Sequence, residues 1–152
     1  MYKHILVAVE NSPADRTIID HVRQLAGLTR AKLLLVHVAD GWAARHYDAL
    51  QLRESEEMTV DREYLERLTA ELMASGFETR WTLAMGDPAS EIMRVAGEEK
   101  VDLIAMSTHG HRWLNDLLRG ATADRVRHGV TVPVLLLRSS STRGSVPDAS
   151  VP

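Results

Sequence analysis

The segment between Gly110 and Gly120 has the residue types that suit a phosphate-binding loop. Nine residues separate the two glycines, the segment carries Arg112 and Arg119, and Thr122 follows it. Glycine lets backbone N–H groups come close to a phosphate, and the start of a helix supplies unpaired donors and partial positive charge. This spacing predicts a site for a polyphosphate. Two glycines at this distance also occur where only a turn and a helix start are needed, and that alternative stays open.

Other polar and aromatic residues are candidates for the same site. His109 and His111 lie two residues apart, as metal ligands can, but the sequence offers no third ligand at a suitable spacing. Glu10 follows an apolar run directly and could hold Mg²⁺ through water if a nucleotide binds. We interpret His37 as a hydrogen-bonded structural histidine rather than a base. Trp113 could stack on a ligand or cover its pocket.

The motifs of several enzyme classes are absent from the sequence. There is no G-x-x-x-x-G-K-[S/T] phosphate loop, no G-x-G-x-x-G after a strand and no G-x-S-x-G nucleophile elbow. Cysteine is absent, which excludes a thiol nucleophile and a disulfide scaffold. The net charge of -3 gives no long-range attraction to nucleic acid or anionic membranes. We therefore expect no catalytic residues.

Five apolar runs of strand length must position these residues. They are Ile5–Val9, Lys32–Val38, Phe77–Leu83, Val101–Met106 and Val132–Leu137. Continuous apolar runs are typical of strands that helices cover on both faces. Their alternation with helical patterns predicts an α/β domain with a parallel sheet and right-handed crossovers. Ligands of such sheets bind beyond the carboxyl ends of the strands, which is where the glycine-containing segment begins.

The first two helices have recognisable ends. Ser12 is the expected N-cap, followed by Pro13 at the first helical position and Asp15 as the acid of a capping box. This helix should run to about Thr29. A long charged helix is expected after a variable region that ends near residue 50, and Gly76 should stop it. Its apolar face consists of Met58, Leu65, Leu68 and Leu72.

The third helix has a clear start signal, whereas the start of the fourth is less well defined by the sequence. Asp87 and Pro88 are the expected N-cap and first residue of the third helix. Residues 107–120 are expected to form an extended loop with some helical turn around 114–118. The fourth helix should then run from about Ala121 to His128, so that Gly120 opens it.

The bulk composition fits one cytoplasmic domain. The chain has 152 residues, of which 45% are hydrophobic and 26% charged. The N-terminus lacks the pattern of a signal peptide, and no segment reaches the roughly 18 to 20 apolar residues that span a bilayer. We expect a domain over residues 1–138 and a disordered tail over 139–152, which is rich in Ser, Thr, Gly and Pro.

A set of short motifs spreads over most of the chain. They are Ile5-Leu6-Val7-Ala8-Val9 with Glu10 after it, Val36-His37-Val38, Gly86-Asp87-Pro88, Val101-Asp102-Leu103-Ile104, Thr108-His109-Gly110 and Val132-Pro133-Val134-Leu135. With this set, the chain resembles the universal stress protein family up to Arg138. The resemblance implies a single doubly wound domain of the adenine nucleotide alpha-hydrolase-like fold. It also implies a five-stranded parallel sheet with strand order 3-2-1-4-5 and helices on both faces.

Nucleotide-binding members of the family carry the motif G-x2-G-x9-G-[S/T], and this chain departs from it at two positions. Its four fixed positions fall on Ser107, Gly110, Gly120 and Ala121. Ser107 adds a side chain where the strand ends, which could crowd a ribose or bond to it. Ala121 removes a hydroxyl donor, which Thr122 could partly replace. Glu10 also stands where family members place an Asp near the adenine and metal, so the charge is kept one methylene further out.

The resemblance implies a site for ATP, or for AMP or ADP, with or without Mg²⁺. The adenine would lie near Ala8 and Val38, and Glu10 near the ribose or metal. The complete set of expected nucleotide-binding residues is Ala8, Val9, Glu10, Val38, Met106, Ser107, Gly110, His111, Arg112, Gly120, Ala121 and Thr122. No metal site formed directly by a side-chain cluster is expected.

The last apolar run suggests a partner. Pro133 cannot donate to a sheet, so Val132–Leu137 belongs at an edge, and an apolar edge is protected best by pairing with a second copy. The resemblance likewise implies a homodimer through this strand. The function expected overall is a homodimeric cytoplasmic stress-response regulator that binds an adenine nucleotide. One alternative is a member whose nucleotide site has lapsed at Ser107 and Ala121 and which acts through protein contacts. A third is slow ATP hydrolysis.

Overall fold

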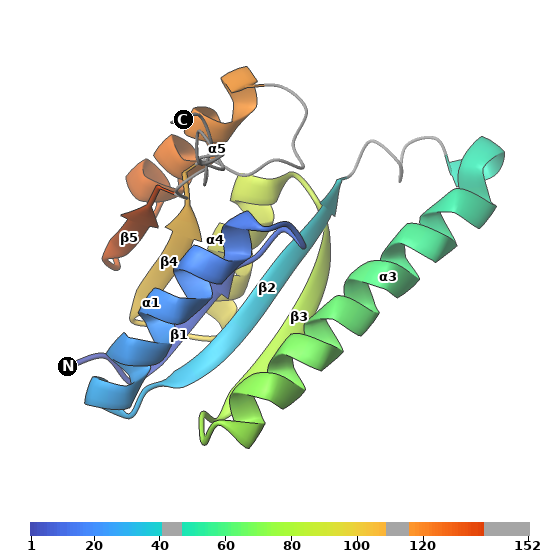
Figure 1. Ribbon diagram of the computed structural model, residues 1–152. Helices are drawn as coiled ribbons and strands as arrows, with labels where there is room; N and C mark the ends of the chain where they lie inside the picture. Colours follow the sequence, from blue (N-terminus) through green and yellow to red (C-terminus); the bar gives the residue numbers. More distant parts are fainter. Residues whose placement is uncertain (41–46, 109–115, 139–152) are drawn as a thin grey trace, which may run out of the picture.

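A parallel sheet of five strands lies at the centre of the structure (Figure 1). The computed structural model describes residues 1–40, 47–108 and 116–138. The strands are β1 (His4–Ala8), β2 (Lys32–Asp40), β3 (Thr79–Gly86), β4 (Leu103–Ser107) and β5 (Val134–Leu137). Their order is β3-β2-β1-β4-β5 and every neighbouring pair is parallel. The doubly wound α/β fold and the strand order 3-2-1-4-5 expected from the sequence are therefore confirmed.

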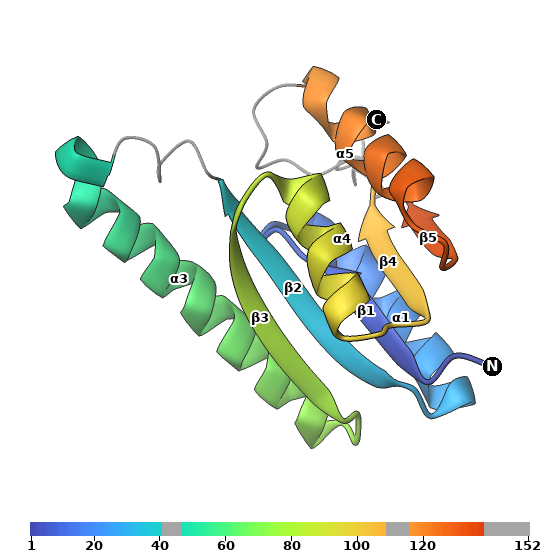
Figure 2. The ribbon, with the colours of Figure 1, turned by 180° about the vertical axis from the view of Figure 1, so that it is seen from behind.

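Helices cover both faces of the sheet. They are α1 (Ala14–Thr29), α3 (Tyr47–Ala74), α4 (Pro88–Glu98) and α5 (Asp116–Gly129). Figure 1 looks onto the face covered by α1 and α3, and Figure 2 onto the opposite face with α4 and α5. None of the described helices is long and apolar enough to cross a membrane.

Alternate residues of each strand fill the two halves of the core. Ile5 and Val7 of β1 pack with α1 and α3, while Leu6 packs with α4 and α5. All three are fully buried. The continuous apolar runs follow from this arrangement, because a strand between two helical layers has no solvated face.

The direction of winding changes between β1 and β4. The chain leaves β1 through α1 on one face and leaves β4 through α5 on the other. In parallel sheets this change separates the loops that follow the two strands and opens a crevice at their carboxyl ends. That edge lies at the top of Figure 1, where the arrowheads of β2 and β4 end.

The predicted start of the last helix is wrong. We expected Gly120 to open it, but α5 begins at Asp116, so Gly120 lies in its second turn. Leucine and arginine, which fill most of the positions before Gly120, form helices readily, and a glycine inside a helix costs only about 1 kcal/mol. Local propensity therefore extends the helix across the glycine.

The predicted cap of α1 also differs from the structure. The N-cap position is occupied by Pro13, not by Ser12, and its side chain makes no capping bond. The Ser12 hydroxyl instead accepts the N–H of Ala14 at 3.2 Å, and Asp15 reaches back to the N–H of Ser12 at 3.4 Å. The two side chains satisfy the helix start from neighbouring positions, so no single N-cap residue is needed.

Other ends agree with the sequence signals more closely. The Asp87 side chain accepts the N–H of Ser90 at 2.9 Å, which confirms it as the N-cap of α4. Gly76 has a φ of 91° just after α3, as expected for a helix stop. The carboxyl ends of β2 and β3 lie further along the chain than predicted, because their pairing continues to Asp40 opposite Gly86, while β3 begins at Thr79 rather than at Phe77.

Candidate functional site

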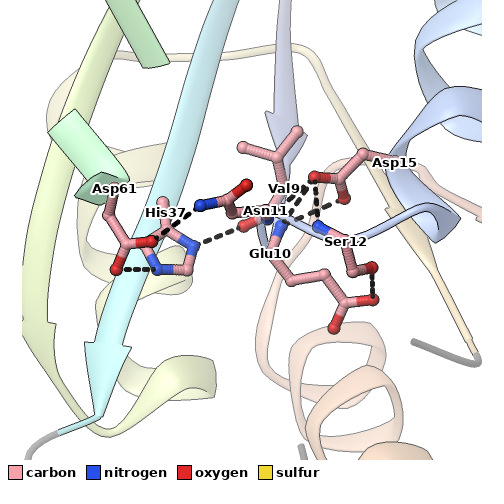
Figure 3. Close-up of polar contacts among 7 residues, drawn as sticks. All are labelled: Val9, Glu10, Asn11, Ser12, Asp15, His37 and Asp61. Carbon is pink, nitrogen blue, oxygen red and sulfur yellow. Dashed lines mark hydrogen bonds and ion pairs between the residues drawn. The ribbon is translucent and has the colours of Figure 1, made fainter. Parts of the chain in front are cut away.

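The loop between β1 and α1 is organised around the carboxylate of Asp15 (Figure 3). This side chain is only 3% exposed. It accepts the backbone N–H of Glu10 at 3.0 and 3.2 Å, of Asn11 at 2.9 Å and of Ser12 at 3.4 Å. Successive amides that converge on one anion form a nest. Because Asp15 fills this nest, a ligand phosphate needs donors from another segment.

A tyrosine completes the shell around Asp15. The Tyr64 hydroxyl of α3 donates to Oδ2 of Asp15 at 2.6 Å. Burial raises the pKa of Asp15, while the hydrogen bonds from Tyr64 and from the loop amides act in the opposite direction. Burial and the negative charge of Asp15 both raise the pKa of Tyr64, which therefore stays a donor.

A second buried contact ties β2 and α3 to the same loop. His37 Nδ1 lies 2.9 Å from the carbonyl oxygen of Val9, and His37 Nε2 lies 3.1 Å from Asp61 Oδ2. The Asn11 amide donates to the other oxygen of Asp61 at 3.1 Å (Figure 3). His37 and Asp61 are 4% and 5% exposed. The hydrogen bonding expected for His37 is thereby confirmed.

Glu10 directs its carboxylate back along the loop. Its Oε1 accepts the Ser12 hydroxyl at 2.8 Å, and the residue is half-buried. The side chain is thus already oriented within the loop at the carboxyl edge. Among the described residues, no group of three or more His, Cys, Asp or Glu side chains could hold a metal ion.

The end of β4 carries a buried hydroxyl. Ser107 is the last residue of the strand, and its Oγ is buried without a hydrogen-bond partner in the part of the chain that the structure describes. The next residue, Thr108, donates its N–H to the Leu137 carbonyl at 2.8 Å. Buried hydroxyls are normally hydrogen-bonded. A ligand atom with a donor or acceptor at this position would therefore satisfy Ser107.

Three of the expected site residues share one face of the sheet. Val38 and Met106 are buried in the core half beneath α4 and α5, and Ala8 packs against the same cluster. Ala123, one residue after Thr122 in α5, belongs to this cluster too. The structure thus brings the ends of β1, β2 and β4 together with α5. Val9 instead packs into the opposite half of the core, beneath α1 and α3.

The start of α5 changes which backbone donors are available. Only the first turn of a helix has unpaired N–H groups, so those of Gly120 and Ala121 face carbonyls four residues earlier. Ala121 is exposed and Thr122 is half-buried. The expected contacts Gly110, His111 and Arg112, and the candidates His109 and Trp113, lie outside the described residues. So does the tail expected to be disordered, residues 139–152.

An ion pair fastens α5 to the neighbouring helix. Arg125 donates to Asp87 at 2.9 Å and to the Ser90 hydroxyl at 3.2 Å. The hydrogen bonds from Arg125 and then from Ser90 hold the pKa of Asp87 well below its usual range. The pair links α5 to the N-terminus of α4, beside the apolar contact that buries Ala123 and Val126 of α5.

Sequence reasoning missed Asp61 and underestimated Asn11 and Asp15. Asp61 falls between Met58 and Leu65 at the spacing of the apolar face of α3. An acidic residue in an apolar stripe needs a buried polar partner. His37, expected to be buried and hydrogen-bonded, was the candidate for that partner. Asn11 gave a weaker signal, since asparagine is among the few residues that tolerate its φ of 57°.

Comparison with known proteins identifies the family. The model of the universal stress protein family matches residues 1–138. The chain belongs to the universal stress protein family. Universal stress protein MJ0577 of Methanocaldococcus jannaschii is 26% identical over 93% of this chain and 98% of its own. The structure of MJ0577 matches with a TM-score of 0.78 over 93% of this chain and 99% of that one.

Two further universal stress proteins share the fold of this one and were solved with nucleotides. One, from Archaeoglobus fulgidus, is in complex with dAMP; it is 21% identical, with a TM-score of 0.66 over 89% of this chain and 97% of that one. Another is in complex with cAMP; it is 20% identical, with a TM-score of 0.65 over 91% of this chain and 98% of that one. At these identities the likeness concerns the fold.

Proposed function

We propose that this universal stress protein binds ATP, or a related adenine nucleotide, and acts as a homodimeric cytoplasmic regulator. The observation that carries the proposal is the buried hydroxyl of Ser107 at the carboxyl edge, which has no hydrogen-bond partner among residues 1–40, 47–108 and 116–138. It lies where winding reverses between β1 and β4, which is where ligands of doubly wound sheets bind. The dAMP and cAMP complexes of proteins with this fold support an adenine nucleotide as the ligand.

The apolar floor would take the adenine. Ala8, Val38 and Met106 belong to one apolar cluster at the strand ends, in which Ala8 is half-buried and the other two are buried. A flat base would lie against the edge of this cluster, next to Ala8. Ser107 Oγ would bond the ribose, filling the place that the family motif leaves to a glycine. Glu10 would face the ribose or the Mg²⁺ of Mg-ATP, and Val9 would hold the strand end beside it.

The segment after β4 would take the phosphates. The amide nest of the β1–α1 loop is occupied by Asp15, so phosphate donors must come from Gly110, His111 and Arg112 and from the start of α5. Gly120, Ala121 and Thr122 would then offer a small surface beside the phosphates rather than backbone donors. Mg²⁺ would bind mainly through phosphate oxygens and water.

Calorimetric titration of nucleotide-stripped protein with Mg-ATP tests the proposal. We expect saturable binding in the micromolar range, weakened at least about tenfold in Gly120→Val, because a branched side chain would crowd the phosphates. Gly27→Val is the matched control. Gly27 is also a helical glycine, in α1, and a Cβ added there would meet nothing within 4 Å.

The outcomes separate the proposal from its alternative. Absence of heat and of copurified nucleotide, with the protein folded, would mean that the departures at Ser107 and Ala121 have disabled the site. The protein would then act through protein contacts. Formation of ADP over time would instead support slow hydrolysis.

The edge of the sheet supports the proposed dimer. β5 pairs with β4 alone among the described strands, and its four residues are half-buried. Pro133 and Leu137 direct their carbonyls to β4. By alternation, Val134 and Leu136 turn their backbone groups to the open edge. Light scattering should give a mass near twice 16.9 kDa, whereas a monomer at micromolar concentration would contradict this part of the proposal.

A further inference from the structure

Buried side chains hold the peptide group between Val9 and Glu10 from both sides (Figure 3). His37 Nδ1 contacts its carbonyl oxygen at 2.9 Å, and the Asp15 carboxylate accepts its N–H at 3.0 and 3.2 Å. The two groups of a trans peptide point in opposite directions. Contacts on both therefore fix the plane of the peptide and, with it, the direction in which Glu10 leaves the backbone.

Asp61 controls two of the contacts that reach this loop. One carboxylate oxygen holds His37 Nε2 at 3.1 Å, and the other accepts the Asn11 amide at 3.1 Å. His37 Nδ1 carries a proton because a carbonyl oxygen only accepts. Loss of Asp61 thus frees the ring of His37 and the side chain of Asn11 together.

We propose that Asp61 and His37 are positioning residues of the nucleotide site. They fix the Val9–Glu10 peptide, and with it the direction in which Glu10 leaves the backbone, while the Ser12 hydroxyl holds the carboxylate itself at 2.8 Å. Together these contacts would determine where the Glu10 carboxylate meets Mg²⁺ on the phosphates of a nucleotide. The inference rests on the proposed function for its ligand, while its geometry is a property of the protein alone. Side chains that orient metal-binding groups typically contribute about 10–100-fold to metal affinity.

Variants of Asp61 and Asn11 separate positioning from folding. Asp61→Leu removes both contacts at similar size. Asp61→Asn keeps them, because its amide oxygen can accept from Asn11 and its NH2 group can donate to a neutral His37. Asn11→Gly removes only the loop contact and suits the φ of 57° at that position, so it serves if Asp61→Leu fails to fold. Thr69→Val, on the same helix, removes a buried hydroxyl that has no partner among the described residues and is the control.

The readout is the ratio of the ATP dissociation constants measured without and with Mg²⁺. We expect this ratio to fall about tenfold in Asp61→Leu and about threefold in Asn11→Gly, because Glu10 loses its direction. Asp61→Asn and Thr69→Val should stay within about twofold of the wild type, and affinity without Mg²⁺ should change little in every variant. An equal loss with and without Mg²⁺, or an unchanged ratio in Asp61→Leu and Asn11→Gly, would overturn the proposal.

Amide hydrogen exchange of Glu10 in the ligand-free protein tests the positioning of Glu10 independently of whether the protein binds a nucleotide. If the wild type binds no ATP, the proposed function fails, and the exchange rate alone decides whether Asp61 positions Glu10. Exchange about tenfold faster in Asp61→Leu but not in Asp61→Asn would support positioning, since one buried hydrogen bond contributes about that factor. Equal rates in the wild type and Asp61→Leu would overturn it.

Discussion

Removing the Tyr64 hydroxyl should destabilise the protein by an amount that depends on pH. In Tyr64→Phe, the buried carboxylate of Asp15 loses a donor at 2.6 Å and keeps its three loop amides. A hydrogen bond to a charged group contributes about 1.5–3 kcal/mol. Because Tyr64 is half-buried and water can partly replace it, we expect a loss of about 2 kcal/mol at neutral pH. Tyr2→Phe, in a half-buried tyrosine that packs against the same half of the core, should change stability by less than about 0.5 kcal/mol.

Urea denaturation of both variants across the acid range is the assay. With a urea slope of about 2 kcal/mol per M, Tyr64→Phe should lower the midpoint by about 1 M at neutral pH. The folded protein holds the Asp15 proton more tightly than the unfolded chain does, because burial raises the pKa of Asp15 above 3.8. As pH rises from 3.8 through the folded pKa, Asp15 therefore lowers the free energy of unfolding, and above that pKa its contribution is constant.

The difference in the free energy of unfolding between the wild type and Tyr64→Phe depends on whether Asp15 is ionised. It should be largest at neutral pH, where Asp15 is ionised, and should shrink once Asp15 is protonated. Loss of the Tyr64 donor should also raise the pKa of Asp15 further, which extends the fall in stability to higher pH. A loss below about 0.5 kcal/mol, or one that is constant over the whole acid range, would refute the reasoning.

Two further predictions concern the loop and the helix contact. Asn11→Val should destabilise the protein by about 1–2 kcal/mol more than Asn11→Gly in thermal denaturation, because a β-branched residue disfavours the φ of 57°. Equal losses of stability in the two variants would mean that the backbone relaxes to another φ. Arg125→Ala should raise the pKa of Asp87 towards its usual value, as followed by NMR titration of the carboxyl carbon, whereas an unchanged pKa would assign the shift to Ser90 instead. The depressed pKa of Asp87 stabilises the folded wild type above pH 3.8, and this stabilisation is lost as the pH falls through the pKa of the folded state. Because Arg125→Ala has less of this stabilisation to lose, its free energy of unfolding should fall less on acidification.

The fold could be predicted from the sequence because each level of signal agreed. The apolar runs, Asp87 as a cap and Gly76 as a stop all pointed to the same alternation of strands and helices. Strand ends were less certain, because pairing with a neighbour rather than local sequence carries β2 on to Asp40. The start of α5 was wrong because of local sequence: the residues before Gly120 favour a helix, which therefore includes the glycine that we expected to begin it.

The site could be predicted only in outline. The sequence indicated the carboxyl edge, and the structure brings Ala8, Val38 and Met106 together there. It could not show that the Asp15 carboxylate accepts the N–H groups of the β1–α1 loop. Nor could it show that Asp61 contacts His37, which lies 24 positions earlier in the chain. Asp61 in the apolar face of α3 indicated that a buried partner was needed, but which residue it meets depends on how α3 packs across the sheet.

The most direct test of the central claim is the amide NMR spectrum of the protein during titration with Mg-ATP. Binding at the carboxyl edge predicts saturable shifts at Glu10, Val38, Ser107 and Thr122. It also predicts unchanged signals at Lys32 and Thr79, which begin β2 and β3 at the opposite edge. Shifts confined to the opposite edge, or no shifts at saturating nucleotide, would contradict the claim that this universal stress protein binds a nucleotide beyond the ends of β1 and β4.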